Sequence, residues 1–316
     1  MIPRLQLLIL AIWAVEVHCD LIFKLEDKNL ATRPFLFVEE SRTADSIYAF
    51  STENLIKCSL HSMPYSCKKV LELPSVDKIL RCSDKLFLLT SMRKAWHFNL
   101  DNLKLTEVNL PFFIFPSALT CRKKNDELQI FGGFHNGLLG LLKVDLLSGT
   151  TTTTYASLFT NSIVDLNFDK FSNLIALSQD GEIAIIKDFS ASRLLSLGEA
   201  QSVAPKLKKL TFKSDIQYPF KILISKNYVC AISSTKVRCF ATEGLRPLEA
   251  ILTHENITNG FMLEDLLVLA TASKITVYKN WQKIREYEGE LVSSHYTSNG
   301  FFIKHNSDLT YVTPKP

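Results

Sequence analysis

The cysteines are the residues of this chain whose type and spacing indicate a definite chemistry. There are seven, and six of them follow the N-terminal apolar segment: Cys58, Cys67, Cys82, Cys121, Cys230 and Cys239. The sequence has no Cys-x-x-Cys motif and no cysteine–histidine spacing of the zinc-finger type, so structural zinc is not favoured. An even number of cysteines is typical of disulfide bonds formed in an oxidising compartment. We therefore expect disulfides and no metal.

Two of the pairs follow from local spacing. If Ser234-Thr235 is a hairpin turn, Cys230 lies opposite Cys239 on neighbouring antiparallel strands. Facing Cβ atoms in such strands are about 5 Å apart, and they are closest at a non-hydrogen-bonded pair. Cys58 and Cys67 bracket a comparable loop that contains a proline. The sequence thus predicts one disulfide in each of these hairpins.

No catalytic constellation is present among the other polar residues. The chain lacks the G-x-S-x-G, H-E-x-x-H and G-x-x-x-x-G-K-[ST] motifs, and no G-x-G-x-x-G opens a helix. Its histidines are scattered. His97 lies between Trp96 and Phe98 in an expected strand, where a lone imidazole usually packs against its neighbours. The sequence therefore predicts no enzyme activity and no cofactor.

The elements that carry these residues are short apolar strands. Runs rich in Val, Ile, Leu, Phe and Tyr alternate with Asn, Asp, Ser, Gly and Lys, and long helical periodicity is missing. Four-strand units recur with starts that are 41, 41, 45, 45 and 49 residues apart: Phe35, Val76, Ser117, Ser162, Leu207 and Asn256. A period of about 40 to 50 residues with four strands is typical of a β-propeller.

The unit from Ser162 to Gly198 shows the pattern most clearly. It predicts strands at 163–168, 173–178 and 182–187, followed by an outer strand at 193–197. The tight turn between the second and third strands contains Asp180-Gly181, a pair suited to positive φ angles. The Asn256 unit repeats the plan, with strands at 260–263, 266–271, 275–279 and 283–287 and a turn at Asn280-Trp281.

Residues 178–185 (SQDGEIAI) resemble the turn and third strand of the WD-repeat family. Ile186 and Lys187 stand where that family has its Trp-Asp pair, and no unit opens with Gly-His. The resemblance implies the architecture of a WD-repeat-like propeller, and it implies no particular function.

The chain ends suggest how the ring closes. After the sixth unit only 300–305 and 308–312 remain, which is too little for a blade, while residues 20–25 (DLIFKL) form another strand-like run. An N-terminal strand that completes the last blade would leave no unpaired edge there. We expect an all-β fold of about seven four-stranded blades, with six as the alternative. Cys82 and Cys121 are 39 residues apart, about one repeat, so a disulfide between them would join adjacent blades.

A propeller has a central channel, and some secreted propeller enzymes hold calcium there. Asp77, Asp165 and Asn167 fall near expected inner strands. Calcium needs six or more oxygen ligands, so turn and edge roles are the preferred interpretation for these three residues. A metal-dependent hydrolase or a small-ligand-binding propeller that uses the channel remains the alternative function.

The N-terminus indicates the secretory pathway. Arg4 precedes an apolar run from Leu5 to Val17, which is shorter than the ~20 residues of a spanning helix. We predict a signal peptide over 1–19, cleaved between Cys19 and Asp20, and a propeller domain over 20–316. An uncleaved anchor, which would hold an ER scaffold at the membrane, and a buried first helix are the alternatives.

Surface chemistry narrows the class of partner. The formal net charge is only +4 and the basic clusters are short, so no nucleic-acid surface is expected. Asn256-Ile257-Thr258 is an N-glycosylation acceptor in an expected loop. Trp281, Arg285 and Tyr287 form a candidate patch for a protein partner, with core packing as the competing role. The preferred function is a non-catalytic protein-interaction scaffold, either extracellular or in the ER lumen.

Overall fold

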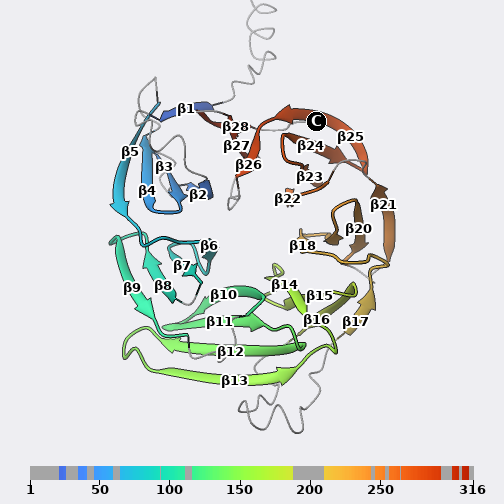
Figure 1. Ribbon diagram of the computed structural model, residues 1–316, viewed down its shortest axis with the longest axis horizontal. Coiled ribbons are helices and arrows are strands. Elements are labelled where there is room, and N and C mark those ends of the chain that lie inside the picture. Colours follow the sequence, from blue (N-terminus) through green and yellow to red (C-terminus); the bar gives the residue numbers. More distant parts are fainter. Residues whose placement is uncertain are drawn as a thin grey trace, which may run out of the picture.

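Figure 1 shows the computed structural model of the protein, residues 1–316. The structure describes residues 21–25, 35–40, 46–59, 65–92, 94–110, 116–187, 210–242, 246–252, 256–263, 265–292, 301–305 and 308–312. Every regular element in these ranges is a strand, and none of them contains a helix long and apolar enough to span a membrane.

Seven four-stranded antiparallel blades form a ring, so the predicted propeller is confirmed and the six-bladed alternative is wrong. Blade 1 consists of β2 (Phe35–Glu40), β3 (Ser46–Ser51), β4 (Asn54–Ser59) and β5 (Tyr65–Glu72). Blade 2 consists of β6 (Lys78–Arg81), β7 (Leu86–Ser91), β8 (Lys94–Asn99) and β9 (Lys104–Val108). Blade 3 consists of β10 (Ala118–Lys124), β11 (Glu127–Gly133), β12 (Leu138–Asp145) and β13 (Thr151–Ser157).

The other half of the ring repeats this order. Blade 4 consists of β14 (Ile163–Phe168), β15 (Leu174–Ser178), β16 (Glu182–Ile186) and β17 (Leu210–Lys213). Blade 5 consists of β18 (Lys221–Ile224), β19 (Tyr228–Ile232), β20 (Lys236–Ala241) and β21 (Pro247–Leu252). Blade 6 consists of β22 (Asn259–Leu263), β23 (Leu266–Ala270), β24 (Lys274–Lys279) and β25 (Gln282–Glu288). Blade 7 contains β26 (Glu290–Val292), β27 (Phe301–His305) and β28 (Asp308–Val312), and β1 (Leu21–Leu25) completes it.

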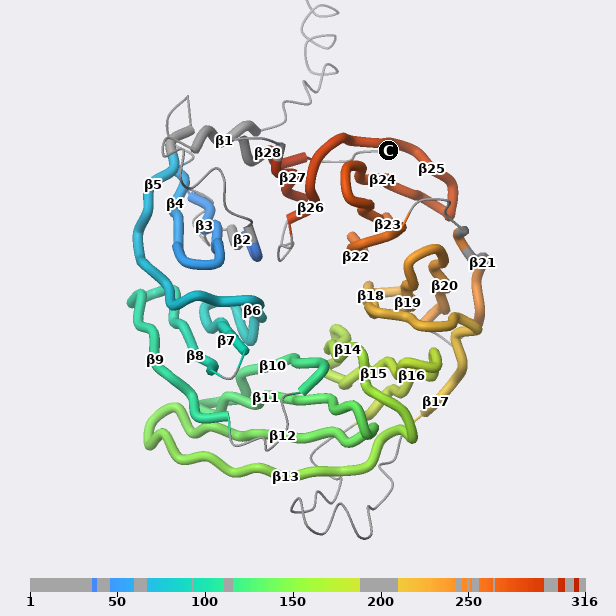
Figure 2. Tube along the Cα trace, viewed as in Figure 1, coloured from blue at the N-terminus to red at the C-terminus, as the bar shows by residue number. Residues whose placement is uncertain are grey.

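The N-terminal strand closes the ring as predicted. β1 pairs antiparallel with β28, with Leu21 opposite Tyr311. It also pairs in parallel with β5 of blade 1, with Phe23 opposite Tyr65, a contact that the sequence did not suggest. The first and last blades therefore share one eight-stranded sheet, and they lie next to each other at the two ends of the colour scale in Figure 2.

The core lies between the blades, because each blade buries both faces of its middle strands against its neighbours. Between blades 1 and 2 the packing is aromatic: Phe50 lies 5.2 Å from Phe87 and 5.9 Å from Phe98, measured between ring centroids. At the junction of blades 3 and 4, Gly133 accommodates Ile163 so closely that a Cβ on the glycine would lie 2.4 Å from Cγ2 of Ile163. Shape complementarity at these junctions sets the geometry of the ring.

Two boundaries differ from the sequence prediction. The outer strand of blade 4 is β17 (Leu210–Lys213), which pairs with β16, so the assignment of that strand to 193–197 is wrong. Residues 193–197 themselves lie outside the described residues. Blade 5 consequently begins at Lys221 and not near Leu207. The outer strand is exposed along most of its length, so it has little of the apolar pattern by which a strand is recognised.

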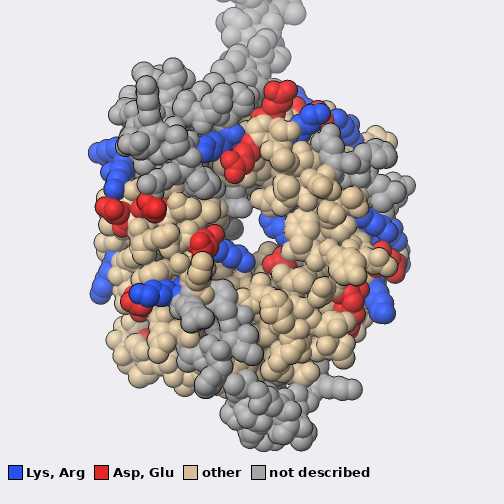
Figure 3. All heavy atoms as spheres, viewed as in Figure 1, with Lys and Arg blue, Asp and Glu red and all other residues tan. Residues whose placement is uncertain are grey.

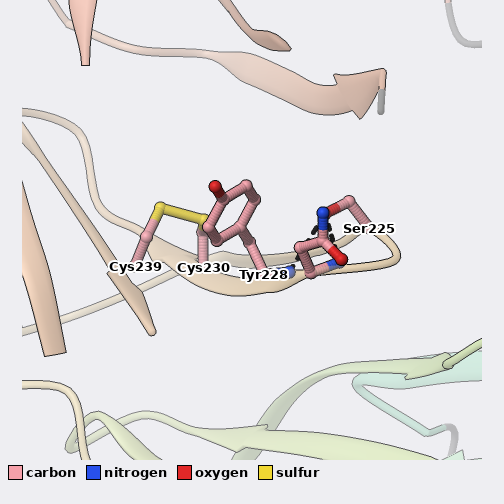
Figure 4. The surroundings of a disulfide bond; sticks show 5 residues. Ser225, Tyr228, Cys230 and Cys239 are labelled. Carbon is pink, nitrogen blue, oxygen red and sulfur yellow. Dashed lines mark hydrogen bonds between the residues drawn. A yellow bond between two sulfur atoms is a disulfide. The ribbon is translucent and has the colours of Figure 1, made fainter. Parts of the chain in front are cut away.

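The six cysteines form the three predicted pairs. Cys58 faces Cys67 across β4 and β5, and Cys230 faces Cys239 across β19 and β20, each with Cα atoms 4.0 Å apart. Cys82 and Cys121 are 4.8 Å apart between their Cα atoms and connect blade 2 to blade 3. In Figure 4 the ring of Tyr228 lies beside the Cys230–Cys239 disulfide. Tyr228 itself is held by the turn, since its N–H donates to Oγ of Ser225 at 3.1 Å.

Candidate interaction surfaces

The connections between strands divide the disc into two faces. Turns that join the first strand to the second, or the third to the fourth, lie on what we call face A; examples are residues 82–85, 146–150, 169–173 and 280–281. Turns that join the second strand to the third, and the connections between blades, lie on face B; examples are 134–137, 179–181 and 214–220. Loops on a rigid scaffold are the usual place for recognition, so each face is a candidate site.

Two exposed apolar side chains stand on face A. Leu147, in the turn between β12 and β13, is 83% exposed, and Phe171, in the turn between β14 and β15, is 71% exposed. Each turn is organised by an aspartate two residues earlier. Oδ1 of Asp145 accepts the N–H of Leu147 at 2.9 Å, and Oδ1 of Asp169 accepts the N–H of Phe171 at 2.9 Å. The aspartates thus order the backbone of the turns that carry these two exposed apolar side chains.

Arg122 fastens the Phe171 turn to blade 3. Its Nη1 donates to the carbonyl oxygen of Ser172 at 3.1 Å, and its Nε donates to Oε1 of Gln129 at 2.7 Å. Its guanidinium carbon lies 5.0 Å from the ring centroid of Phe168, within the range of a cation–π contact. Desolvation lowers the pKa of Arg122, an effect that the charge of Glu127 opposes. The turn is therefore supported by two blades.

Face B carries a polar pocket. Its volume is about 490 Å³, and it is lined by Asn161, Gln179, Asp180, Gln217 and Tyr218. Tyr218 is 73% exposed, and its backbone φ is 51°. A hydrogen bond from the Ser178 hydroxyl, and a further one from Asn161, lower the pKa of Asp180, so that this carboxylate is charged at neutral pH. This pocket offers acceptors and one aromatic ring.

An open channel passes through the disc, with charged side chains at its border (Figure 3). Inner strands of three blades contribute Lys78, Asp165 and Lys221. Asp165 accepts the N–H of Ile222 at 2.8 Å and that of Leu166 at 3.0 Å. Burial raises the pKa of Asp165, an effect that the two lysines oppose, and burial lowers the pKa of Lys221.

Each of the three candidate calcium ligands accepts a backbone N–H. Asp165 lies in the channel, whereas Oδ1 of Asn167 accepts the N–H of Phe168 at 2.8 Å and Oδ2 of Asp77 accepts that of Met92 at 3.2 Å. In the described part of the chain, no three His, Cys, Asp or Glu side chains are grouped so that they could hold a metal ion. The contacts of Asn167 and Asp77 fit the turn and edge roles preferred for them, whereas Asp165 lies on an inner strand beside two lysines.

The structure brings together only two members of the candidate partner patch, Arg285 and Tyr287, and places Trp281 apart from them. Trp281 lies in the face A turn between β24 and β25, at a φ of 66°, and its ring packs 5.5 Å from that of Tyr228 in blade 5. Tyr287, at the other end of β25, packs 5.7 Å from Phe301. Nη1 of Arg285, an exposed residue between them, lies 3.4 Å from the hydroxyl oxygen of Tyr287. Both rings are half-buried, and Arg285 is the member of the set most accessible to a partner.

Asn256 is exposed on face B, in the connection between blades 5 and 6. Ile257 beside it is buried at 3% exposure, and its N–H donates to the carbonyl oxygen of Ser234 at 2.7 Å. The acceptor side chain therefore extends from a fixed backbone into solvent.

Comparison with known proteins shows the architecture alone. No protein-family model matches the chain, and no curated protein matches its sequence. Among solved structures, the WD40 repeats of RRP9 superpose with a TM-score of 0.64 at 11% identity, covering 90% of this chain and 95% of that one. The WD40 domain of Pan2 from Neurospora crassa gives a TM-score of 0.60 at 11% identity, covering 90% of each chain. This chain is a WD-repeat-like β-propeller in architecture.

A third similar structure belongs to a surface protein. PorZ, a bacterial surface component of the type-IX secretion system of Porphyromonas gingivalis, superposes with a TM-score of 0.62 at 12% identity. The match covers 89% of this chain and 37% of PorZ. These similarities concern the fold alone, while three cysteine pairs at disulfide distance are typical of an oxidising environment.

Proposed function

We propose that this protein is a non-catalytic scaffold of the secretory pathway, secreted or resident in the ER lumen, which binds another protein through face A. The observation that carries the proposal is the pair of exposed apolar residues, Leu147 and Phe171, held on neighbouring blades by aspartate-organised turns. Because the backbone that carries these anchors is already ordered, less conformational entropy is lost on binding, which favours affinity.

The compartment is inferred from two independent features. The three cysteine pairs require oxidation, and the apolar segment over Leu5–Val17 supplies a signal for entry. Cleavage after Cys19 would leave Asp20 as the first residue, directly before β1. Asn256, exposed on face B, would then carry a glycan on the face opposite Leu147 and Phe171.

Partner capture with matched variants tests the binding face. The mature chain is immobilised and exposed to a native secretory extract, and captured proteins are quantified by mass spectrometry. Leu147→Ala with Phe171→Ala should reduce capture of the specific partner about tenfold or more, as the loss of central anchors does. Met92→Ala, at an 81% exposed residue on face B, is the control and should leave capture unchanged. Equal capture by wild type and by the double variant would reject face A as the binding face.

The compartment has its own test. N-terminal sequencing of material made in secreting cells should begin at Asp20, and digestion with a glycosidase should reduce its mass. An Asn256→Gln variant should lose that mass change. An intact Met1, or retention in the membrane after an alkaline wash, would support the uncleaved anchor instead.

A further inference from the structure

A polar pocket opens on face A between blades 2 and 3. Its volume is about 660 Å³, which suits a small organic molecule. Six charged residues line it: Asp84, Lys85, Asp101, Lys104, Lys123 and Asp126. Neither Leu147 nor Phe171 is among its lining residues, and Leu146, directly before Leu147, is one of them.

Some of the charged side chains in this pocket form ion pairs and others do not. Lys85 forms an ion pair with Asp101, and Nη2 of Arg81 lies 3.0 Å from Oδ1 of Asp84. Lys104 and Lys123 have no ion-pair partner among the described residues. The carboxylate of Asp126 likewise has no ion-pair partner among the described residues. Positive charge therefore exceeds negative charge among the groups that are available to a ligand.

The uncharged groups also present donors. Oδ1 of Asn99 accepts the N–H of Asp101 at 2.9 Å, and Oδ1 of Asn102 accepts the N–H of Lys104 at 3.0 Å. Because the amide oxygens are occupied in this way, the two side chains have their N–H₂ groups left for a ligand.

His97 adds a further donor. Its Nδ1 is shielded from solvent, and in the part of the chain that the structure describes it has no hydrogen-bond partner, so Nε2 is the nitrogen open to the pocket. Desolvation, and then the nearby charge of Lys104, lower the pKa of His97, so the imidazole is neutral at neutral pH. The neutral ring that keeps its proton on Nε2 presents an N–H to the pocket.

A disulfide fixes the walls of the pocket. Cys82 directly precedes Ser83 and Asp84 of one wall, and Cys121 lies two residues before Lys123 of the other. The N–H of Lys123 donates to the carbonyl oxygen of Cys82 at 2.9 Å, which adds a backbone contact across the same junction. The backbone of both walls is thus held in place before any ligand arrives.

We propose that this pocket binds the phosphate or sulfate group of a small hydroxylated molecule, with Lys104, Lys123 and Nε2 of His97 donating to its oxygens. A tetrahedral oxyanion accepts several hydrogen bonds from different directions, and charge-assisted bonds to ammonium groups are the stronger ones. Asp126 is placed to accept from a hydroxyl group of the same ligand.

The test uses the mature, disulfide-bonded chain and defined probes. Ribose phosphate, its sulfate analogue and unmodified ribose are titrated by calorimetry, and the His97 ring signal is followed by NMR. Both anionic probes should bind and shift that signal, and unmodified ribose should bind at least about tenfold more weakly. A preference for one of the two probes assigns the natural ligand as phosphorylated or sulfated. Failure of both to saturate the protein at millimolar concentration would overturn the proposal.

Neighbouring lysines supply a matched pair of variants. Lys123→Met should weaken ribose phosphate binding about five- to tenfold, whereas Lys124→Met, next to it on β10 but outside the pocket lining, should change it less than about twofold. Equal losses in both variants would show that general surface charge, and not this pocket, attracts the probe. His97→Leu should weaken binding while His97→Gln, which keeps a donor, retains more of it. Unchanged melting temperatures show that the variants are folded.

Discussion

Two junctions of the ring are fastened in different ways. At the closure, β1 forms backbone ladders with β28 on one edge and with β5 on the other. At the junction of blades 2 and 3, a disulfide and a bond from the N–H of Lys123 to the carbonyl oxygen of Cys82 connect the turn after β6 to β10. The closure stabilises the native state through contacts made on folding, whereas the disulfide acts chiefly by restricting the unfolded chain. The two junctions should therefore respond differently to sequence changes.

Removal of the closing strand should have the largest effect. Deletion of residues 20–25 after the signal peptide exposes an edge of β28 and frees β5, so we expect the free energy of unfolding to fall by on the order of 5 kcal/mol or more. Chemical denaturation measures the loss. Deletion of residues 313–316 is the control and should cost less than about 1 kcal/mol. An unchanged unfolding midpoint after the first deletion would show that β1 does not close the ring.

The disulfide between blades should come next. Cys82 and Cys121 close a loop with a sequence separation of 39, and in the chain-entropy model such a bond contributes about 4 kcal/mol. Replacement of both by Ala should lower the free energy of unfolding by about that amount, measured with the other two disulfides intact. A loss no larger than that in a hairpin double variant would contradict this model for the junction.

The hairpin disulfides should contribute less. Cys230 and Cys239 have a sequence separation of 9, so their replacement by Ala should cost about 3 kcal/mol from loop closure. The two cysteines already face each other in a backbone ladder, so the loosened blade should keep its strands. Hydrogen exchange of β19 and β20 checks this: protection in these strands should fall without disappearing, and complete loss would show that the bond is needed for the hairpin.

The junction of blades 3 and 4 has no disulfide among the described residues, and it combines hydrogen bonds, such as that from the N–H of Ile163 to the carbonyl oxygen of Phe134 at 3.1 Å, with close packing. Gly133→Ala would bring a Cβ within 2.4 Å of Cγ2 of Ile163, and overpacking of this kind costs about 2 kcal/mol. Adding Ile163→Ala removes the contact with Cγ2 and leaves that with Cβ of residue 163 at 2.7 Å, so the overpacking is reduced and the double variant should be less destabilised than the sum of the two single variants. If the losses in free energy of unfolding, measured by thermal unfolding, were strictly additive, the two residues would not be in repulsive contact.

The fold was largely predictable because strand patterns are local. The strands at Ile163–Phe168 and Leu266–Ala270 were placed to within a residue, and the 39-residue spacing of Cys82 and Cys121 located an inter-blade bond. The error in blade 4 arose where the third and fourth strands are separated by residues 187–209, much longer than the turns in other blades. Equal spacing of repeats cannot reveal a long connection inside one unit.

The candidate site was less predictable, because it is formed by turns that are distant in the sequence and meet on one face of the disc, and not by a local sequence pattern. Sequence analysis chose Trp281, whose ring packs on Tyr228, and overlooked Leu147 and Phe171. The signal was present: in each turn an apolar residue follows an aspartate by two positions, a spacing at which the carboxylate can accept its N–H. The donors of the blade 2 and blade 3 pocket come from turns and strands of separate units, and only folding brings them together.

The double pairing of β1 has a consequence for biosynthesis. On a ribosome, β1 is made first and β28 last, so the antiparallel ladder that completes blade 7 cannot form until nearly the whole chain has emerged. β5, in contrast, follows β1 by about forty residues, and it offers a parallel edge early in synthesis. Blade 1 can thus shelter the N-terminal strand while the other blades are added. The strand that seals the ring is the earliest one translated and the last to gain both of its neighbours.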